Sequence, residues 1–336
     1  MSESLAASGA EIIRRGRVQA ADVGRLREAL AESGSVAVED VRLLFAIHEA
    51  CSADDPGWSD FFVHAVARFI VRDRPPSGYL TQDKADWLTA RLADANGVIA
   101  TRVELEILVA ALERARWRPA SLVRFALRQV EHAVRGGAGP LRACSARAPG
   151  EISASEIALV RRILCANGGD EATALTREEA QVLFSIDESL SDSFRNPAWT
   201  ELFVKAIAHA LMAGSGHAAP PRREALRGDS WMNLLHEIWP HAFPAAAVAS
   251  NVDLPTDKYR RQSAEERSLA RLDRQRIELI TDETMTVADA RWLAQRLGRA
   301  GPLTAAETAL IGSLRRAKPH LHPVIEDVLE RRPLAA

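Results

Sequence analysis

The feature that constrains this chain most is an internal duplication. The segment at 43–70, LLFAIHEACSADDPGWSDFFVHAVARFI, aligns with VLFSIDESLSDSFRNPAWTELFVKAIAHAL at 182–211 once a two-residue insertion is allowed. A second pair follows in the same order, with LTQDKADWLTARLADANG at 80–97 and MTVADARWLAQRLGRAG at 285–301. Repeats of this length predict a duplicated domain and do not match the short units of a solenoid.

Apolar residues in the first matched pair recur at the spacing of one helix face. Strand signals are weak along the chain, because alternating β-branched residues are scarce. The sequence therefore predicts an all-α fold with two homologous multi-helix modules in tandem. Its predicted core includes two matched rows, Trp58, Phe61, Phe62, Ala65, Val66, Phe69 and Ile70 in the first copy and Trp199, Leu202, Phe203, Ala206, Ile207, Ala210 and Leu211 in the second.

The same comparison predicts the domain boundaries. We expect a first helical module at 1–117, a connecting helix and loop at 118–150, and a second helical module at 151–318. The second copy is the longer one, because it carries a predicted helical insertion near 215–282. A C-terminal helix and tail complete the chain at 319–336.

Threonine and glutamate recur three residues apart at predicted helix starts. Thr101 precedes Glu104 in the first copy, and Thr304 precedes Glu307 at the matching place in the second. In such a capping box, the threonine oxygen and the glutamate satisfy N–H groups that a helix start leaves without partners. Thr176 and Glu179 predict a further helix start of the same kind.

Composition excludes several classes of protein. The net charge is −2, and only four of the 43 basic residues are lysines, so no nucleic-acid surface is expected. No window approaches the apolar length of a membrane span. The cysteines, Cys51, Cys144 and Cys165, form no CxxC pair, which is typical of a reducing cytoplasm. We therefore expect a cytoplasmic protein without a membrane segment or a cofactor.

One turn has some features of a metal site. Asp94 and Asn96 precede Gly97, and Glu104 follows, an order that partly matches an EF-hand loop. The register fails by one residue, since Glu104 stands beyond the expected glutamate position and belongs to the predicted capping box. The second copy lacks the acids. A plain turn between two helices is the preferred interpretation, and no metal is expected.

Polar residues on the matched helices give a second kind of candidate site. Glu49 and Glu188 are kept in both copies, so we consider a polar pocket formed by them, or else a helix-end contact of each to a nearby arginine or backbone N–H. Histidines are not kept between the copies. Asp187 stands in the second copy where the first has His48, and Lys205 stands where the first has His64. These replacements predict solvated or half-exposed positions without a catalytic role.

Three tryptophans do not repeat, namely Trp117, Trp231 and Trp239. The last two lie eight residues apart on the predicted inserted helix, near one face with Leu235. That face either packs on its own module or binds a partner or a second copy. Trp231, Leu235 and Trp239 are the residues predicted to bind a partner.

The order of motifs LFxIxE, PxW, LFVxAIxxxL, a tryptophan-containing helix and a T-x-x-E helix resembles a family of internally duplicated bacterial all-helical proteins of unassigned function. Its helix–turn–helix units are distantly similar to TerB-like and EF-hand modules. In TerB-like modules acidic turns can bind metal, so this resemblance implies a divalent-cation-responsive stress module as one alternative.

No nucleophile elbow, Walker loop, dinucleotide glycine pattern or zinc-protease spacing is present. The abundant core pattern and the lack of a repeated polar constellation favour a non-catalytic helical interaction or scaffold protein. Its partner is an unknown protein or a second copy. The alternatives are the cation-responsive module and an enzyme whose site the sequence does not identify.

Overall fold

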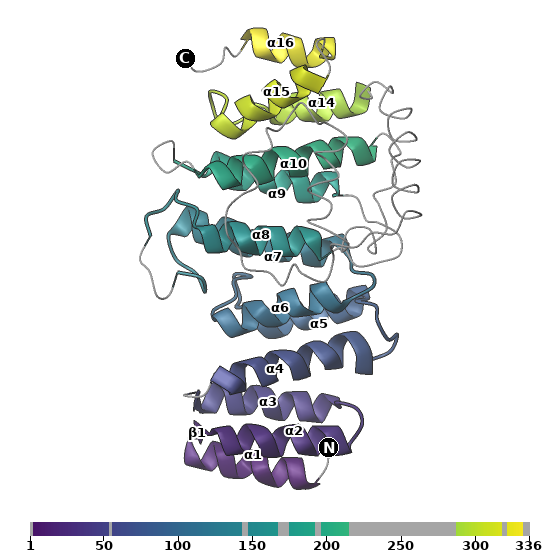
Figure 1. The fold of residues 1–336 in the computed structure, drawn as a ribbon, viewed down its shortest axis with the longest axis vertical. Helices are drawn as coiled ribbons and strands as arrows, with labels where there is room; N and C mark the ends of the chain where they lie inside the picture. The colour runs from purple at the N-terminus through teal and green to yellow at the C-terminus, as the bar shows by residue number, and fades with distance from the viewer. Residues whose placement is uncertain are drawn as a thin grey trace, which may run out of the picture. The chain divides into compact units, whose positions relative to one another are not determined.

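The computed structural model describes residues 3–53, 56–142, 147–166, 175–191, 196–214, 287–317 and 321–331. Over these residues the fold is all-α, as the sequence predicts (Figure 1). The predicted insertion near 215–282 lies outside the described residues, and so do Trp231, Leu235 and Trp239. The chain divides into two compact units, Met1–Arg147 with Arg162–Gly168 as unit 1, and Ala148–Arg161 with Gly169–Ala336 as unit 2.

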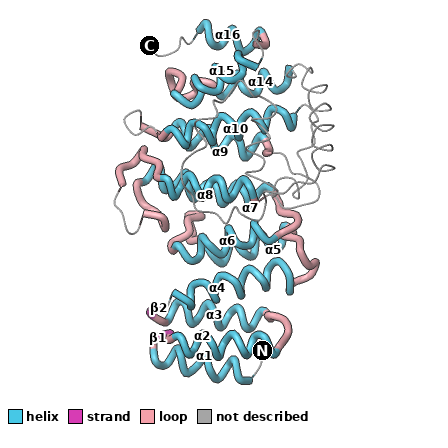
Figure 2. Tube along the Cα trace, in the orientation of Figure 1, coloured by secondary structure: helices cyan, strands magenta, loops and turns pink. Residues whose placement is uncertain are grey.

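Unit 1 is a succession of helices of similar length. A π-helical turn, η1, directly continues one of them, and two two-residue strands pair in parallel beside the first three helices (Figure 2). The elements are α1 (Glu3–Arg15), β1 (Arg17–Val18), α2 (Ala20–Glu32), α3 (Val38–Ala50), β2 (Ser52–Ala53), α4 (Pro56–Arg68), η1 (Phe69–Asp73), α5 (Gln82–Leu92), α6 (Arg102–Arg114) and α7 (Ala120–Gly136).

Helices of unit 1 pack on their chain neighbours and on the next helix but one. α1 packs on α2 and α3, α2 packs on α4, α4 packs on α6, and α5 packs on α7. This pattern is typical of stacked helix pairs, the arrangement within α-solenoids. The alignment did not predict the stacking, because the repeat that it detects spans several helices at once.

The described helices of unit 2 pack on one another in an order like that of unit 1. The helices are α8 (Ala154–Cys165), whose last turn belongs to unit 1, α9 (Arg177–Glu188), α10 (Pro197–Gly214), α14 (Val287–Arg296), α15 (Ala305–Ala317) and α16 (Pro323–Arg331). α10 packs on α9 and α15, and α14 packs on α16, as α4 packs on α3 and α6, and α5 on α7. The duplication remains an inference from the sequence, and these parallels support it.

Both predicted apolar rows are buried, which confirms them as core. Trp58 is 0% exposed, and burying a side chain of that size contributes about 1.5–3 kcal/mol or more. The ring of Phe45 meets Phe62 edge-on at 5.0 Å between centroids, and Phe184 meets Phe203 at the same distance and the same 83° angle. The two aligned segments therefore make the same aromatic contact in the same geometry.

In the described ranges, no helix is both long enough and apolar enough to cross a membrane.

Candidate interaction surface

Most buried acids in the described residues have one task, which is to cap a helix. Six of the seven stand third in their helix, and the seventh is Asp187. A carboxylate at the third position can accept the N–H of the residue before the helix. Five do so at 2.8–2.9 Å, namely Asp22, Asp40, Glu156, Glu179 and Glu307, while Asp289 forms an ion pair with Arg177 at 2.5 Å.

The three predicted capping boxes all form. The N–H of Glu104 donates to the threonine oxygen of Thr101 at 3.1 Å, and Thr101 N–H donates back to the Glu104 carboxylate at 3.0 Å. The boxes at Thr304 and Thr176 have the same reciprocal pair of bonds. These acids therefore serve the fold, as the sequence predicts.

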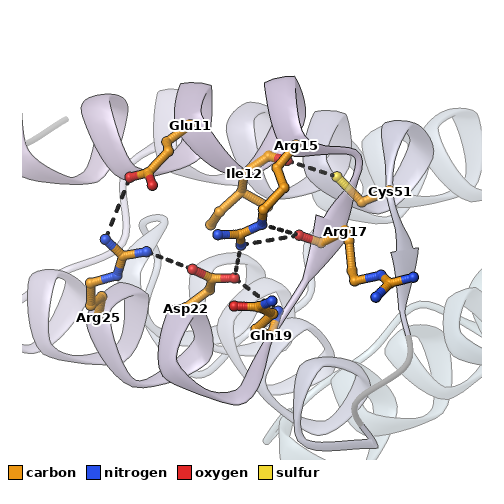
Figure 3. Close-up of polar contacts among 8 residues, drawn as sticks. All are labelled: Glu11, Ile12, Arg15, Arg17, Gln19, Asp22, Arg25 and Cys51. Atoms are coloured by element: carbon orange, nitrogen blue, oxygen red, sulfur yellow. Dashed lines mark hydrogen bonds and ion pairs between the residues drawn. The ribbon is translucent and has the colours of Figure 1, made fainter.

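Asp22 shows how such a cap becomes a wider polar network (Figure 3). Its carboxylate accepts the N–H of Gln19 and pairs with Arg15 from α1 and with Arg25 from α2, and Arg25 reaches Glu11 at 3.5 Å. Burial alone would raise the pKa of Asp22, but the Gln19 and Arg25 hydrogen bonds and both arginine charges lower it. The network joins α1 to α2, so its role is structural.

Cys51 lies beside this network and ties α3 to α1. Its Sγ donates to the backbone oxygen of Ile12 at 3.6 Å (Figure 3), and burial raises the pKa of the thiol. A neutral thiol is a weak nucleophile and a poor metal ligand. Cys51 is therefore a packing residue.

The two acids predicted to form a polar pocket lie in different units. Glu49 lies in the last turn of α3, its side chain is 61% exposed, and it pairs with Arg91 at 2.5 Å. The Arg91 guanidinium also lies 3.9 Å from the centre of the Phe45 ring. Glu188 ends α9 of unit 2 and is half-buried. Glu49 thus makes the helix-end contact with an arginine that was the alternative to a pocket.

Asp187 corrects an expectation about exposure. The sequence predicts a solvated or half-exposed residue, yet Asp187 is only 5% exposed. Its carboxylate accepts the indole N–H of Trp199 at 2.8 Å and the hydroxyl of Thr304 at 2.5 Å, so it links α9 to α10 and α15. In unit 1 the half-buried His48 takes the equivalent place, and its Nδ1 accepts the indole N–H of Trp58 at 3.4 Å.

Lys205 is a second residue whose exposure was wrongly predicted. It is buried and pairs with Glu201 at 2.5 Å, one helical turn away. His64, its counterpart in the first copy, is exposed as expected. A change of residue type between the aligned segments therefore coincides with solvent exposure at His64 but not at Lys205 or Asp187.

Three acids gather at the start of α15. Glu307 accepts N–H groups of Gly298 at 3.0 Å and Thr304 at 2.8 Å. Burial raises the pKa of Glu307, and the negative charges of Asp187 and Glu188 raise it further. Both oxygens of the Glu307 carboxylate accept backbone N–H groups, so Glu307 is a helix cap with a raised pKa.

The turn considered for a metal is held by its own backbone. Asp94 Oδ1 accepts the N–H groups of Val98 at 2.9 Å and Asn96 at 2.8 Å, and these bonds lower the pKa of Asp94. Glu104 is engaged by Thr101, and Gly97 adopts the positive φ of 77° that the turn needs. Within the described ranges no group of three His, Cys, Asp or Glu side chains could hold a metal ion.

Two large aromatic side chains of unit 1 stand out because they are exposed. Tyr79 is 43% exposed and Trp117 is 48% exposed. Their two loops pair side by side, since Arg116 N–H donates to Gly78 O at 2.7 Å and Leu80 N–H donates to Trp117 O at 2.9 Å. We call Tyr79, Trp117, Arg74 and Arg116 the aromatic edge.

The loop that carries Tyr79 is fixed from beneath by a buried lysine. Lys84 Nζ donates to the backbone oxygens of Pro76 and Tyr79, both at 2.8 Å. Burial lowers the pKa of Lys84, and the charge of Arg74 lowers it further. Gly78 has a φ of 86°, and a Cβ there would lie 3.3 Å from Cδ of Arg116. Tyr79 is therefore presented on a rigid loop against which Arg116 packs.

The polar groups of the aromatic edge are not used by the described part of the chain. Neither the Tyr79 hydroxyl nor the Trp117 indole N–H has a hydrogen-bond partner there, and Arg74 and Arg116 form no ion pair there. Buried or bound tyrosine and tryptophan normally use these groups. The aromatic edge thus offers apolar surface area together with hydrogen-bond donors that a partner could use.

The sequence pattern does not predict the aromatic edge as a binding site. One signal was present, because Trp117 is among the tryptophans that the duplication does not repeat, whereas the repeated Trp58 and Trp199 are buried. Tyr79 gave no such signal, since the pairing of its loop with that of Trp117 is a tertiary feature.

No protein-family model, curated protein sequence or solved structure matches this chain.

Proposed function

We propose that this chain is a non-catalytic helical interaction or scaffold protein that binds a protein partner through the aromatic edge. The observation that carries the proposal is the exposed pair of Tyr79 and Trp117 on two hydrogen-bonded loops. Tyrosine, tryptophan and arginine are the residue types that dominate binding energy at protein interfaces.

Rigidity of the two loops supports this role. Binding costs free energy when flexible loops must be ordered, and a loop already held in place avoids much of that cost. The Lys84 ammonium, the backbone pairing and the packing of Arg116 on Gly78 all hold Tyr79 before any partner arrives.

The uses of the buried acids also support an interaction protein over an enzyme. General acid–base chemistry needs a carboxyl group that can reach a substrate. In the described residues the buried carboxylates are engaged by helix N–H groups, by arginines or by Trp199. The absence of a CxxC pair supports a reducing cytoplasm as the place of action.

Affinity capture from the native cell tests the proposal with three matched baits. These are the full chain, a Tyr79→Ala/Trp117→Ala variant and a Trp231→Ala/Trp239→Ala variant. We expect one protein to be recovered with the full chain and with the Trp231→Ala/Trp239→Ala variant. The same protein should be lost with the Tyr79→Ala/Trp117→Ala variant.

Equal recovery with all three baits would contradict binding at the aromatic edge. Loss only with Trp231→Ala/Trp239→Ala would instead assign binding to the predicted face with Leu235. Circular dichroism of each bait confirms that a lost partner does not reflect a lost fold.

A further inference from the structure

We propose that the occupant of the aromatic edge is an acidic, extended peptide segment of the partner, with apolar side chains between its carboxylates. The inference depends on the proposed function and adds the chemistry of the partner. It follows from the charge, the geometry and the small extent of the edge.

The charge of the two loops is opposite in sign to that of the chain. Segments 74–80 and 114–119 contain Arg74, Arg114 and Arg116 and no acidic residue, while the chain carries −2. Arg118 in the second segment is buried and donates to Ile163 O, so it does not add to this surface charge. Charge of one sign in a confined region attracts a partner of the other sign and steers its approach. A partner for these loops is therefore acidic.

Arg116 stands where a peptide on the two aromatic rings would meet it. It precedes Trp117 and lies against Gly78, the neighbour of Tyr79. Arg74 lies on the same loop as Tyr79, directly after η1. Arginine forms paired hydrogen bonds with a carboxylate, and the rings supply apolar contact area for the side chains between carboxylates.

The extent of the edge favours a peptide over a nucleic acid. Single-stranded nucleic acids bind along a basic groove that spans about 4–16 nucleotides in one common class of domain. Here the basic loops lead directly to Asp83 and Asp86, both exposed at the start of α5. Those carboxylates would repel a phosphate backbone that continued past Tyr79, whereas a short peptide would end before them.

Fluorescence anisotropy of the full chain with three labelled probes tests this inference. The probes are an octapeptide of alternating Glu and Leu, the same peptide with Lys in place of Glu, and a 20-nucleotide oligothymidine. We expect the Glu-Leu peptide alone to bind, and binding to weaken as salt rises. Trp117→Ala and Arg116→Glu should each weaken it about tenfold or more, the loss typical of one interface hot spot.

Arg42→Glu on α3 is the matched control, because it makes the same charge change at another exposed arginine of unit 1. It should bind the Glu-Leu peptide like the unaltered chain. Equal binding of the Lys-Leu peptide, tighter binding of oligothymidine, or binding unchanged by Trp117→Ala would each overturn the inference. If the native partner is lost with Tyr79→Ala/Trp117→Ala and no acidic peptide binds, only the acidic chemistry fails and the proposed function stands.

Discussion

In the described part of the chain, Trp58 and Trp199 are buried in the core, whereas Trp117 faces solvent. Trp58 stacks on Phe62 at 5.6 Å within the core, whereas Trp117 is 48% exposed. Replacing Trp58 with alanine should cost about 3–5 kcal/mol of unfolding free energy, because a large cavity replaces the indole. Trp117→Ala should change it by no more than about 0.5 kcal/mol. Urea unfolding followed by circular dichroism measures both, and comparable losses would show that Trp117 is a core residue.

Glu307 should make stability depend on pH in a direction opposite to an ordinary capping acid. Burial, with help from Asp187 and Glu188, raises its pKa above 4.5 in the folded chain. The folded state therefore retains a proton that the unfolded state releases, and stability falls as pH rises from 4.5 through the folded pKa.

Glu307→Gln is the matched variant, since glutamine also completes a capping box but does not ionise. The melting temperature of the unaltered chain, relative to that of Glu307→Gln, should decrease as the pH is raised from about 4 to 8. A difference that stays constant or grows with pH would show that the Glu307 pKa is not raised.

Asp187 is the polar link between three helices of unit 2, since it accepts hydrogen bonds from Trp199 on α10 and from Thr304 before α15. Asp187→Ala leaves both donors without an acceptor, which at about 1–3 kcal/mol per unsatisfied group should cost about 2–6 kcal/mol. Asp187→Asn keeps an acceptor oxygen and should lose less. Hydrogen exchange should become faster in α10 and α15 of the alanine variant, and unchanged exchange there would contradict the link.

Lys84 gives a prediction for the loops of the aromatic edge. Lys84→Met preserves the buried stem but removes the donors to Pro76 and Tyr79. The amide of Leu80, which donates to Trp117 O, should then exchange about tenfold faster, because local opening costs less free energy. Arg74→Met at the same loop serves as the control and should leave this amide protected. Equal protection in both variants would show that the loop needs no support from Lys84.

The fold follows from the sequence wherever local pattern decides the outcome. Helix-face periodicity placed Phe62 and Phe203 in the core, and the T-x-x-E spacing located the start of α6 and α15. Prediction failed where a tertiary partner decides, because a buried polar residue such as Asp187 or Lys205 cannot be told from an exposed one by type alone. The aromatic edge was missed for the same reason, since the loops of Tyr79 and Trp117 are 38 positions apart in the sequence and pair only in the folded chain.

For the molecule as a whole, the proposed role of the helices is to hold the rigid aromatic edge in place for a protein partner. Photo-crosslinking in the native cell tests this most directly, with benzoylphenylalanine placed in the full chain at position 79 or, as a control, at position 42 on α3. We expect a discrete crosslinked product with another protein from position 79 and none from position 42. Crosslinking that is absent at 79, or equal at both positions, would contradict an interaction function for the aromatic edge.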